Sequence, residues 1–323
     1  MKSFTMRKMR CRIFLLIFVM LMWALYSSQN IIMELWSQKE QDVVEARLLG
    51  PVAADDPGVI SILRNHFLTP PSTKPYNLST DPFYIKAKHY GSWGSIHKQI
   101  KTLFGSQRGG FFIEAGALDG EMLSNTLWLE QHLGWTGLLV EPSPENYQML
   151  AAKQRKAWTS HTCLSLKAYP KKEVIVSLSR RKIRENDFSR VLFQHQGSSF
   201  ILGVSLDSRL YEGLQKLSET SYSVIQCFPL SSYLLALNVS VVDLLSLDIQ
   251  GSEKSVLKYF PWEALNIRVI VIEVVNYEML DQEFVNYMKR NNYTLINYMG
   301  EDYTFVRDGD PTLKNIDTVK IYL

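Results

Sequence analysis

Apolar runs and amphipathic segments alternate along the chain from residue 110 onward. Predominantly apolar runs, typical of strands buried on both faces, occupy residues 110–116, 137–142, 241–249 and 267–275. Helical spacing or helix-capping residues mark residues 121–133, 143–155, 251–260 and 281–290. Shorter strands are predicted at 161–166 and 173–178, and an antiparallel pair at 293–300 and 302–309. The pattern predicts an α/β fold: a doubly wound, mostly parallel sheet with helices on both faces and a terminal antiparallel hairpin.

Residues 179–221 interrupt this alternation. The segment is polar and carries four basic residues close together, Arg180, Arg181, Lys182 and Arg184. We interpret the segment as an insertion in the α/β domain. Its basic cluster is either a solvated surface or a loop that faces a substrate or a partner.

The first 33 residues have the pattern of a membrane anchor. Five basic residues and no acid precede an uncharged apolar run at 13–26. Apolar residues return at 31–33, so segment 13–33 reaches the roughly 20 residues that a span needs. The positive-inside rule then leaves residues 1–12 in the cytosol and places the rest in the lumen of the secretory pathway or outside the cell. A cleaved signal peptide is the alternative, although the cleavage motif is a poor match.

The remaining chain divides into a stem and a domain. Charged segments and prolines mark residues 34–82 as a stem that need not pack a core, and the globular domain is predicted to cover 83–323. The net charge of +3 is smaller than the five positive charges of the N-terminal tail. Without that tail the chain is slightly acidic, so its composition gives no argument for nucleic-acid binding and no such partner is expected.

Sequons and cysteines agree with a lumenal domain. Glycan acceptor sites are predicted at Asn77, Asn238 and Asn292. Cys163 and Cys227 are the only cysteines beyond the predicted span. They form either a disulfide or two buried free thiols.

The turn after the first strand holds the first candidate binding residues. Glu114 ends the apolar run, and Gly116 and Gly120 follow. Ligands of doubly wound sheets bind beyond the carboxyl ends of the strands, and glycine lets the backbone approach them closely, although two glycines alone also fit an ordinary turn. The next strand ends in Glu141, where an acid can accept both hydroxyls of a ribose. Because no G-x-G-x-x-G pattern is present, a nucleoside without phosphates, such as S-adenosylmethionine, fits better than a dinucleotide.

Four sequence blocks carry a resemblance to a known family. They are residues 112–130, 134–150, 227–237 and 242–257. In this order and spacing they resemble the FkbM-type methyltransferase domain over about residues 83–306. They look most like its animal branch, the Star proteins, which are type II membrane proteins. The resemblance implies a class I methyltransferase fold with an S-adenosylmethionine pocket.

The resemblance assigns roles to individual residues. Glu114, Gly116 and Gly120 would form the first cofactor motif, with Asp119 beside the pocket and Glu141 on the ribose. Asp248, which ends the fourth strong strand, is the candidate catalytic acid. The family often has a second acid two residues later, and this chain has Gln250 there, which removes a potential base or metal ligand.

The ends of two neighbouring predicted strands suggest a metal site. Asp248, Glu273 and Asn276 would bring three oxygen donors together for Mg²⁺, which could orient and deprotonate a hydroxyl acceptor. In the alternative, Asp248 caps the following helix and Glu273 makes a structural pair.

Two functions remain open from the sequence. The first is a Star-like trafficking protein that escorts membrane-tethered growth-factor precursors from the endoplasmic reticulum through the Golgi or endosomes, as the resemblance implies. The anchor, the stem and Gln250 favour it. The second is an active O-methyltransferase for a glycan, a lipid or a small hydroxylated metabolite, which Glu141 and the glycine motif favour.

Overall fold

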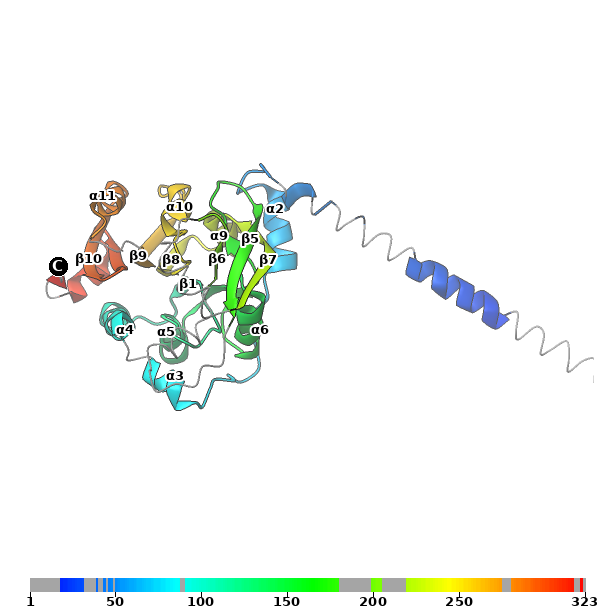
Figure 1. Cartoon of the computed structure of the whole chain (residues 1–323), viewed down its shortest axis with the longest axis horizontal. Helices are drawn as coiled ribbons and strands as arrows, with labels where there is room; N and C mark the ends of the chain where they lie inside the picture. Colours follow the sequence, from blue (N-terminus) through cyan, green and yellow to red (C-terminus); the bar gives the residue numbers. More distant parts are fainter. Residues whose placement is uncertain are drawn as a thin grey trace, which may run out of the picture. The chain divides into compact units, whose positions relative to one another are not determined.

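The computed structural model describes most of the chain. The described residues are 18–31, 39, 43–44, 46–48, 50–87, 91–179, 199–204, 219–274, 280–316 and 320–321. Two compact units are present, Met1–Arg47 and Leu48–Leu323. In the first unit, residues 18–31 form a helix (Figure 1), and its large apolar side chains are exposed.

Within the described residues, no helix combines the length and the apolar character that a membrane crossing requires. The predicted span at 13–33 also includes residues 13–17 and 32–33, which lie outside the described part of the chain. The membrane anchor therefore stays a prediction.

The second unit contains an eight-stranded sheet in the order β12-β10-β11-β9-β8-β1-β2-β3. Five consecutive strands are parallel: β9 (Asn266–Glu273), β8 (Val241–Leu247), β1 (Phe111–Ala115), β2 (Thr136–Val140) and β3 (Trp158–Ser160). The antiparallel part consists of β10 (Tyr293–Met299) and β11 (Asp302–Arg307), with the short β12 (Lys320–Ile321) parallel to β10. The predicted mostly parallel sheet with a terminal antiparallel hairpin is confirmed.

A second, four-stranded sheet was not predicted. Its order is β4 (Cys163–Leu164), β7 (Glu219–Phe228), β5 (Lys171–Ser179) and β6 (Ser199–Ile201). Part of the predicted insertion at 179–221 therefore belongs to strands, whereas its basic cluster lies outside the described residues. Cys163 and Cys227 face each other in the register of β4 and β7, and a disulfide joins them.

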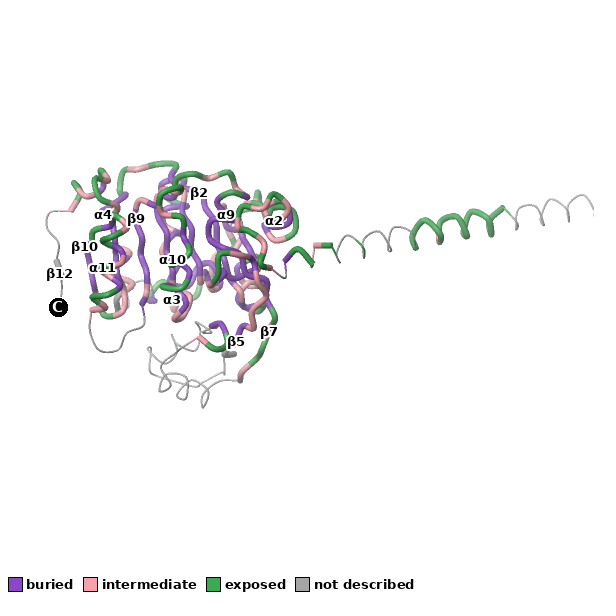
Figure 2. The backbone as a smooth tube through the Cα atoms, turned by 90° about the horizontal axis from the view of Figure 1, so that it is seen from above, coloured by how far each residue is buried: buried purple, intermediate pink, exposed green. Residues whose placement is uncertain are grey.

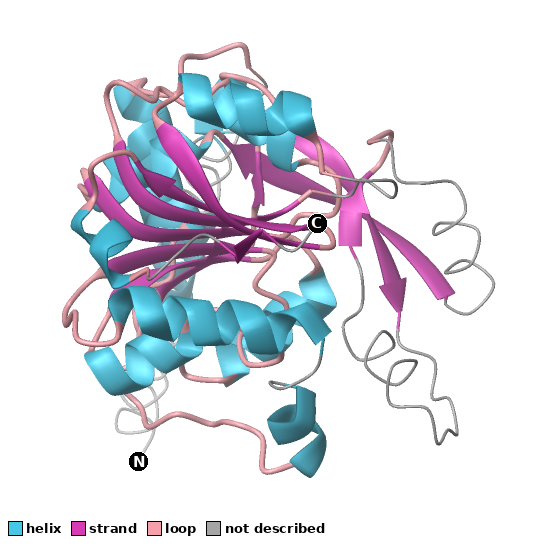
Figure 3. Ribbon diagram, turned by 90° about the vertical axis from the view of Figure 1, so that its left-hand side faces the viewer, coloured by secondary structure: helices cyan, strands magenta, loops and turns pink. Residues whose placement is uncertain are grey.

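Helices cover both faces of the main sheet (Figure 3). On one face, α4 (Gly91–Phe104), α5 (Leu127–Leu133) and α6 (Pro144–Ala152) share a core with Phe112 and Leu244. On the other side lie α9 (Leu230–Leu237), α10 (Glu253–Lys258) and α11 (Gln282–Arg290) (Figure 1). The strands between them are buried over most of their length (Figure 2), as the predominantly apolar runs predicted.

Two predicted helices differ from the observed ones. The helix predicted at 121–133 begins only at Leu127, because residues 116–126 form a loop that is bound to Glu114. The helix after β2 begins as predicted, with the Ser143 hydroxyl accepting from the backbone N–H of Asn146 at 3.5 Å, but it ends at Ala152.

The compact unit begins at Leu48, upstream of the domain boundary predicted at residue 82. It includes α2 (Pro57–Ile62), the π-helix η1 (Leu63–Phe67) and α3 (Pro82–Ala87). Leu48, Val59 and Leu63 are buried in the core. Thr69 forms an antiparallel bridge with Thr159 and so covers the edge of the main sheet at β3. Residues 48–82, here called the strap, therefore pack on the domain and do not form a free stem.

Candidate functional site

The loop between β1 and α5, residues 116–126, lies at the carboxyl end of the main sheet. Gly116 has φ +82°, and a Cβ there would come within 1.8 Å of the carbonyl oxygen of Asp248, just after β8. Gly120 has φ +75°, and its Cβ would lie 2.3 Å from a methyl group of Leu150 on α6. Packing against the backbone thus requires glycine at position 116, and the positive φ favours glycine at position 120, whether or not a ligand approaches them.

The carboxylate of Glu114 holds this loop in place. It accepts hydrogen bonds from the backbone N–H of Asn125 at 2.8 Å, the Ser124 hydroxyl at 2.8 Å and the Thr126 hydroxyl at 2.5 Å. Burial raises the pKa of Glu114, while the Arg155 guanidinium and these hydrogen bonds lower it. The predicted cofactor residue therefore has a loop-positioning role in this structure.

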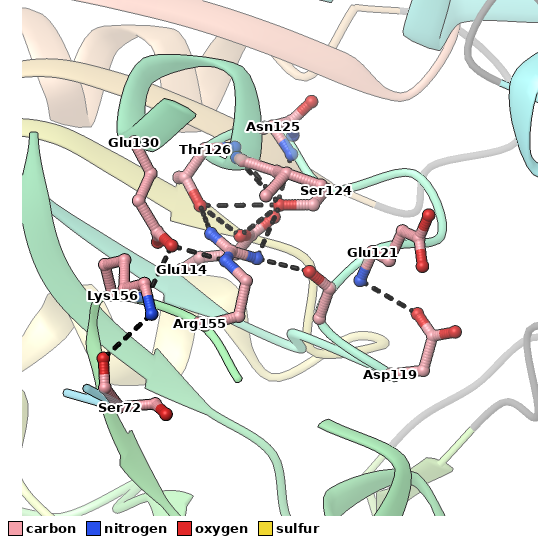
Figure 4. A network of polar contacts seen from close by, with 12 residues as sticks. Ser72, Glu114, Asp119, Glu121, Ser124, Asn125, Thr126, Glu130, Arg155 and Lys156 are labelled. Atoms are coloured by element: carbon pink, nitrogen blue, oxygen red, sulfur yellow. Dashed lines mark hydrogen bonds and ion pairs between the residues drawn. The ribbon is translucent and has the colours of Figure 1, made fainter. Parts of the chain in front are cut away.

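A buried arginine that the sequence analysis missed ties the loop to α5 (Figure 4). Arg155 forms an ion pair with Glu130 at 3.0 Å, and both side chains are fully buried. Its guanidinium also donates to the carbonyl of Gly120 and to the hydroxyls of Ser124, at 3.4 Å, and Thr126, at 3.1 Å. In the sequence Arg155 stands in the run Lys153–Lys156, which has the pattern of a solvated helix end, so no local signal pointed to it.

Asp119 contacts Tyr84 of α3 and does not line the cavity described below. Its carboxylate accepts from the backbone N–H groups of Glu121, at 3.0 Å, and Met122, at 2.7 Å, and from the hydroxyl of Tyr84 at 2.6 Å. Lys153 forms ion pairs with Glu121 at 2.7 Å and with Asp119 at 3.7 Å. These contacts fasten α3 to the loop.

The predicted ribose acid, Glu141, is buried at the end of β2. One of its oxygens accepts from the backbone N–H of Leu118 at 2.9 Å, and the other from the N–H of Ser143 at 2.9 Å and the Asn146 amide at 3.4 Å. Burial raises the pKa of Glu141 to about 7, although these hydrogen bonds oppose the shift. Leu118 itself has φ +50°, a conformation that costs a residue with a side chain about 1–2 kcal/mol. The loop backbone thus holds the position that a ribose hydroxyl would take.

Asp248 and Glu273 lie at neighbouring strand ends, as predicted, but an amide lies between them. The side-chain nitrogen of Gln250 donates to Asp248 at 2.8 Å and to Glu273 at 3.1 Å. Burial, followed by the charge of Asp248, raises the pKa of Glu273 well above its usual value. The third proposed metal ligand, Asn276, lies outside the described residues.

The turn that follows Asp248 is closed by Glu253. Its carboxylate accepts from the N–H groups of Ile249, at 2.8 Å, and Gly251, at 3.2 Å. Glu253 therefore closes the turn that precedes α10, and the N-cap residue Ser252 makes no side-chain capping hydrogen bond. Burial raises the pKa of Glu253 to about 7.

A cavity opens between the ends of β1 and β8. Its lining includes Trp93, Glu114, Met122, Leu123, Asn125 and Asp248. The cavity is small: the space open to a water-sized molecule is about 20 Å³, which is room for about one water. None of the lining residues is basic. Glu141 does not line it, so the structure separates the predicted ribose acid from the open space.

The residues fit one part of S-adenosylmethionine directly. An acidic, partly apolar cavity suits the positively charged sulfonium and α-amino groups of the molecule, whereas the ribose end meets a carboxylate that already accepts three hydrogen bonds. A resident metal fits less well, because the Gln250 amide bridges Asp248 and Glu273. Among the described residues, no three His, Cys, Asp or Glu side chains form a metal-binding group.

The fold and this site define the chain as a methyltransferase-type α/β protein. The family model of the methyltransferase FkbM domain matches residues 114–295, more than half of the chain. The chain therefore belongs to the FkbM methyltransferase family, and S-adenosylmethionine is the cofactor that this family implies. No curated protein sequence matches the chain.

Solved structures with a similar fold are distant. A methyltransferase FkbM from Methylobacillus flagellatus KT is 12% identical, with 77% of this chain and 58% of that chain covered and a TM-score of 0.35. A TehB-like SAM-dependent methyltransferase from Corynebacterium glutamicum is 12% identical, with 66% and 87% covered and a TM-score of 0.32. A SAM-dependent methyltransferase from Aquifex aeolicus is 10% identical, with 70% and 96% covered and a TM-score of 0.31. The assignment rests on the family model and not on these structures.

The three predicted glycan acceptors are all exposed. Asn238 and Asn292 lie at turns with positive φ, at +55° and +65°. The side-chain nitrogen of Asn77 donates to the carbonyl of Ala152 at 3.1 Å, so a glycan on Asn77 would require that contact to break.

Proposed function

We propose that the chain binds S-adenosylmethionine between β1 and β8 and transfers its methyl group to a hydroxyl of a glycan, a lipid or a small metabolite. The observation that carries the proposal is the acidic cavity at the carboxyl ends of these strands, within the residues that match the FkbM family. Doubly wound folds bind their ligands at this edge of the sheet.

Each candidate residue has a distinct task in this proposal. S-adenosylmethionine supplies an activated methyl group for in-line displacement, so positioning of the acceptor contributes most of the rate. Asp248 lines the cavity and is the carboxylate that we assign to accept the proton of the acceptor hydroxyl. Glu141 accepts hydrogen bonds from the ribose hydroxyls, which take the place of its hydrogen bond from the backbone N–H of Leu118. Glu114 and Arg155 hold the loop through Ser124 and Thr126.

Calorimetry of the full chain in detergent tests the cofactor proposal. The wild type should bind S-adenosylmethionine, and Glu141→Gln should weaken binding at least tenfold while leaving the circular dichroism spectrum unchanged. Glu145→Gln is the matched control, because this carboxylate is exposed in the first turn of α6 and should not affect binding. Absence of binding to the folded wild type would reject the proposal.

A trafficking role without catalysis is the second candidate function. Two observations favour it: the Gln250 amide bridges Asp248 and Glu273, and large apolar side chains on β7 and just after β6 are exposed. Leu202 is 52% exposed, Tyr222 59% and Val224 67%. Such a patch suits a protein partner. Following the resemblance to Star proteins, the proposed partner is a membrane-tethered growth-factor precursor.

A pull-down with such a precursor tests this second role. Val224→Lys should abolish capture, whereas Leu235→Lys on α9, which is 45% exposed, should leave it intact. Equal capture by both variants would reject the apolar face as the cargo site.

We further propose that residues 13–33 anchor the chain in membranes of the endoplasmic reticulum, Golgi and endosomes, with the folded unit lumenal. The exposed apolar side chains of helix 18–31 support this placement. A lumenal domain should be protected from protease in microsomes and should lose mass with glycosidase. Removal of the sequon at either Asn238 or Asn292 should reduce this loss of mass more than removal of the sequon at Asn77, because the Asn77 side chain is hydrogen-bonded to the carbonyl of Ala152.

A further inference from the structure

A groove is lined by residues of α10 and α11, and it shares no lining residue with the cavity between β1 and β8. The space in the groove that is open to a water-sized molecule is about 300 Å³, against about 20 Å³ in the cavity. Small-molecule sites begin at a volume of about 300 Å³. The groove is therefore large enough for one small organic ligand.

Helical spacing places the side chains that line the groove. Lys254 and Lys258 are four residues apart on α10, and Glu283, Tyr287 and Arg290 follow at intervals of four and three on α11. The two helices follow the neighbouring parallel strands β8 and β9 and lie on the same side of the main sheet (Figure 1), so they run in the same direction. Lys258 and Arg290 therefore belong to the same end of the groove, where both helices finish.

Contacts between the helices use some of the polar groups in the groove. Lys254 forms an ion pair with Asp281 at 2.7 Å, near the starts of the two helices. The hydroxyl of Tyr287 donates to the carbonyl of Leu257 at 2.8 Å and accepts from the indole N–H of Trp262 at 3.0 Å. The other charged side chains of the lining are left to meet a ligand.

These other charges are unevenly distributed. Lys258 and Arg290 carry two positive charges, and within the part of the chain that the structure describes neither forms an ion pair. Glu283 comes seven residues before Arg290, which corresponds to about 10 Å along α11. Between them, the ring of Tyr287 stacks with that of the buried Phe284. The groove thus has two cations at one end, an aromatic surface in the middle and a carboxylate at the other end.

We propose that this groove binds a small phosphate ester with a hydroxylated ring, such as a sugar phosphate. A phosphate monoester carries up to about two negative charges at neutral pH and three acceptor oxygens, which match Lys258 and Arg290. A hydroxyl at the far side of the ring donates to Glu283, and the ring packs on Tyr287. The inference goes beyond the proposed methyl transfer and does not depend on S-adenosylmethionine.

Calorimetry of the full chain in detergent at low salt tests the groove, with glucose 6-phosphate, inorganic phosphate and glucose as probes. The wild type should bind glucose 6-phosphate most tightly, inorganic phosphate more weakly and glucose not detectably. Lys258→Met and Arg290→Met should each weaken glucose 6-phosphate by about tenfold, because each removes a charge-assisted hydrogen bond. Glu283→Ala should weaken glucose 6-phosphate but not inorganic phosphate, because only the sugar reaches that end.

Lys289→Met is the matched control, because Lys289 is exposed beside Arg290 on α11 but does not line the groove. Its affinity for glucose 6-phosphate should equal that of the wild type. Absence of glucose 6-phosphate binding to the folded wild type, or an equal loss in Lys289→Met and Arg290→Met, would overturn the site. Equal affinity for glucose 6-phosphate and inorganic phosphate would overturn the ester as its ligand. All four variants should bind S-adenosylmethionine as the wild type does, so failure of this site is distinguishable from failure of the cofactor proposal.

Discussion

Replacement of Arg155 by methionine tests the link between the buried ion pair and the cofactor loop. The guanidinium is fully buried, lies 3.0 Å from Glu130 and donates to Gly120, Ser124 and Thr126. Methionine keeps an unbranched apolar side chain but leaves the Glu130 carboxylate buried without its partner. Breaking a buried pair in this way costs about 3–5 kcal/mol. That is a large share of the 5–15 kcal/mol by which domains are typically stable.

Urea denaturation of the full chain, followed by tryptophan fluorescence, measures this loss. The double variant Arg155→Met, Glu130→Gln removes both charges, so it should be more stable than Arg155→Met alone by about 2 kcal/mol or more. The comparison isolates the uncompensated charge from the loss of packing and hydrogen bonds.

The pH dependence of the Arg155→Met penalty adds a second test. Burial raises the pKa of Glu114, and Arg155 opposes that rise. A raised carboxyl pKa gives stability that is present below the unfolded pKa and lost as pH increases. Removal of Arg155 should therefore cost more at pH 8 than at pH 5. A penalty below about 1 kcal/mol, or one that is independent of pH, would refute the assigned role of Arg155.

Three further predictions follow from the packing and burial of the site. Gly116→Ala should destabilise the unit by several kcal/mol in urea, because its Cβ would overlap the carbonyl of Asp248, whereas Gly109→Ala, at φ +68° with no neighbour within 4 Å, should cost only about 1 kcal/mol. The free energy of unfolding should fall as pH increases from about 4.5 to 8, by up to about 3 kcal/mol for each of Glu141 and Glu253, because burial raises their pKa values to about 7. Glu141→Gln should make this pH dependence less steep. An unchanged slope in the variant would contradict the raised pKa of Glu141. Reduction of the Cys163–Cys227 disulfide, which spans 64 residues, should cost about 4 kcal/mol, and Cys163→Ser, Cys227→Ser should no longer respond to reductant.

The sequence predicted the elements whose signals are local. The apolar runs identified β1, β2, β8 and β9, because strands buried on both faces need uninterrupted apolar side chains. The start of α6 was predicted from Ser143 and Pro144, because helix capping depends on residues that are adjacent in the sequence. Such signals depend on spacing within one element, which the sequence contains directly.

Features that depend on distant partners were missed or misassigned. The Glu114–Arg155 network joins residues about 40 positions apart, and neither partner's role is visible in its local sequence. The strap from Leu48 was taken for a stem, because its buried leucines and valines are separated by prolines and lack a helical period. The four-stranded sheet was missed because β5 and β7 pair across the insertion.

The candidate acids illustrate why a motif and a binding site differ physically. Glu114, Asp119 and Glu141 each stand where a family motif expects an acid, yet their oxygens accept hydrogen bonds from the loop at residues 118–126. A buried carboxylate must be compensated, and in this structure the loop's own N–H and hydroxyl groups compensate it. A ribose hydroxyl that binds Glu141 must therefore displace the backbone N–H of Leu118.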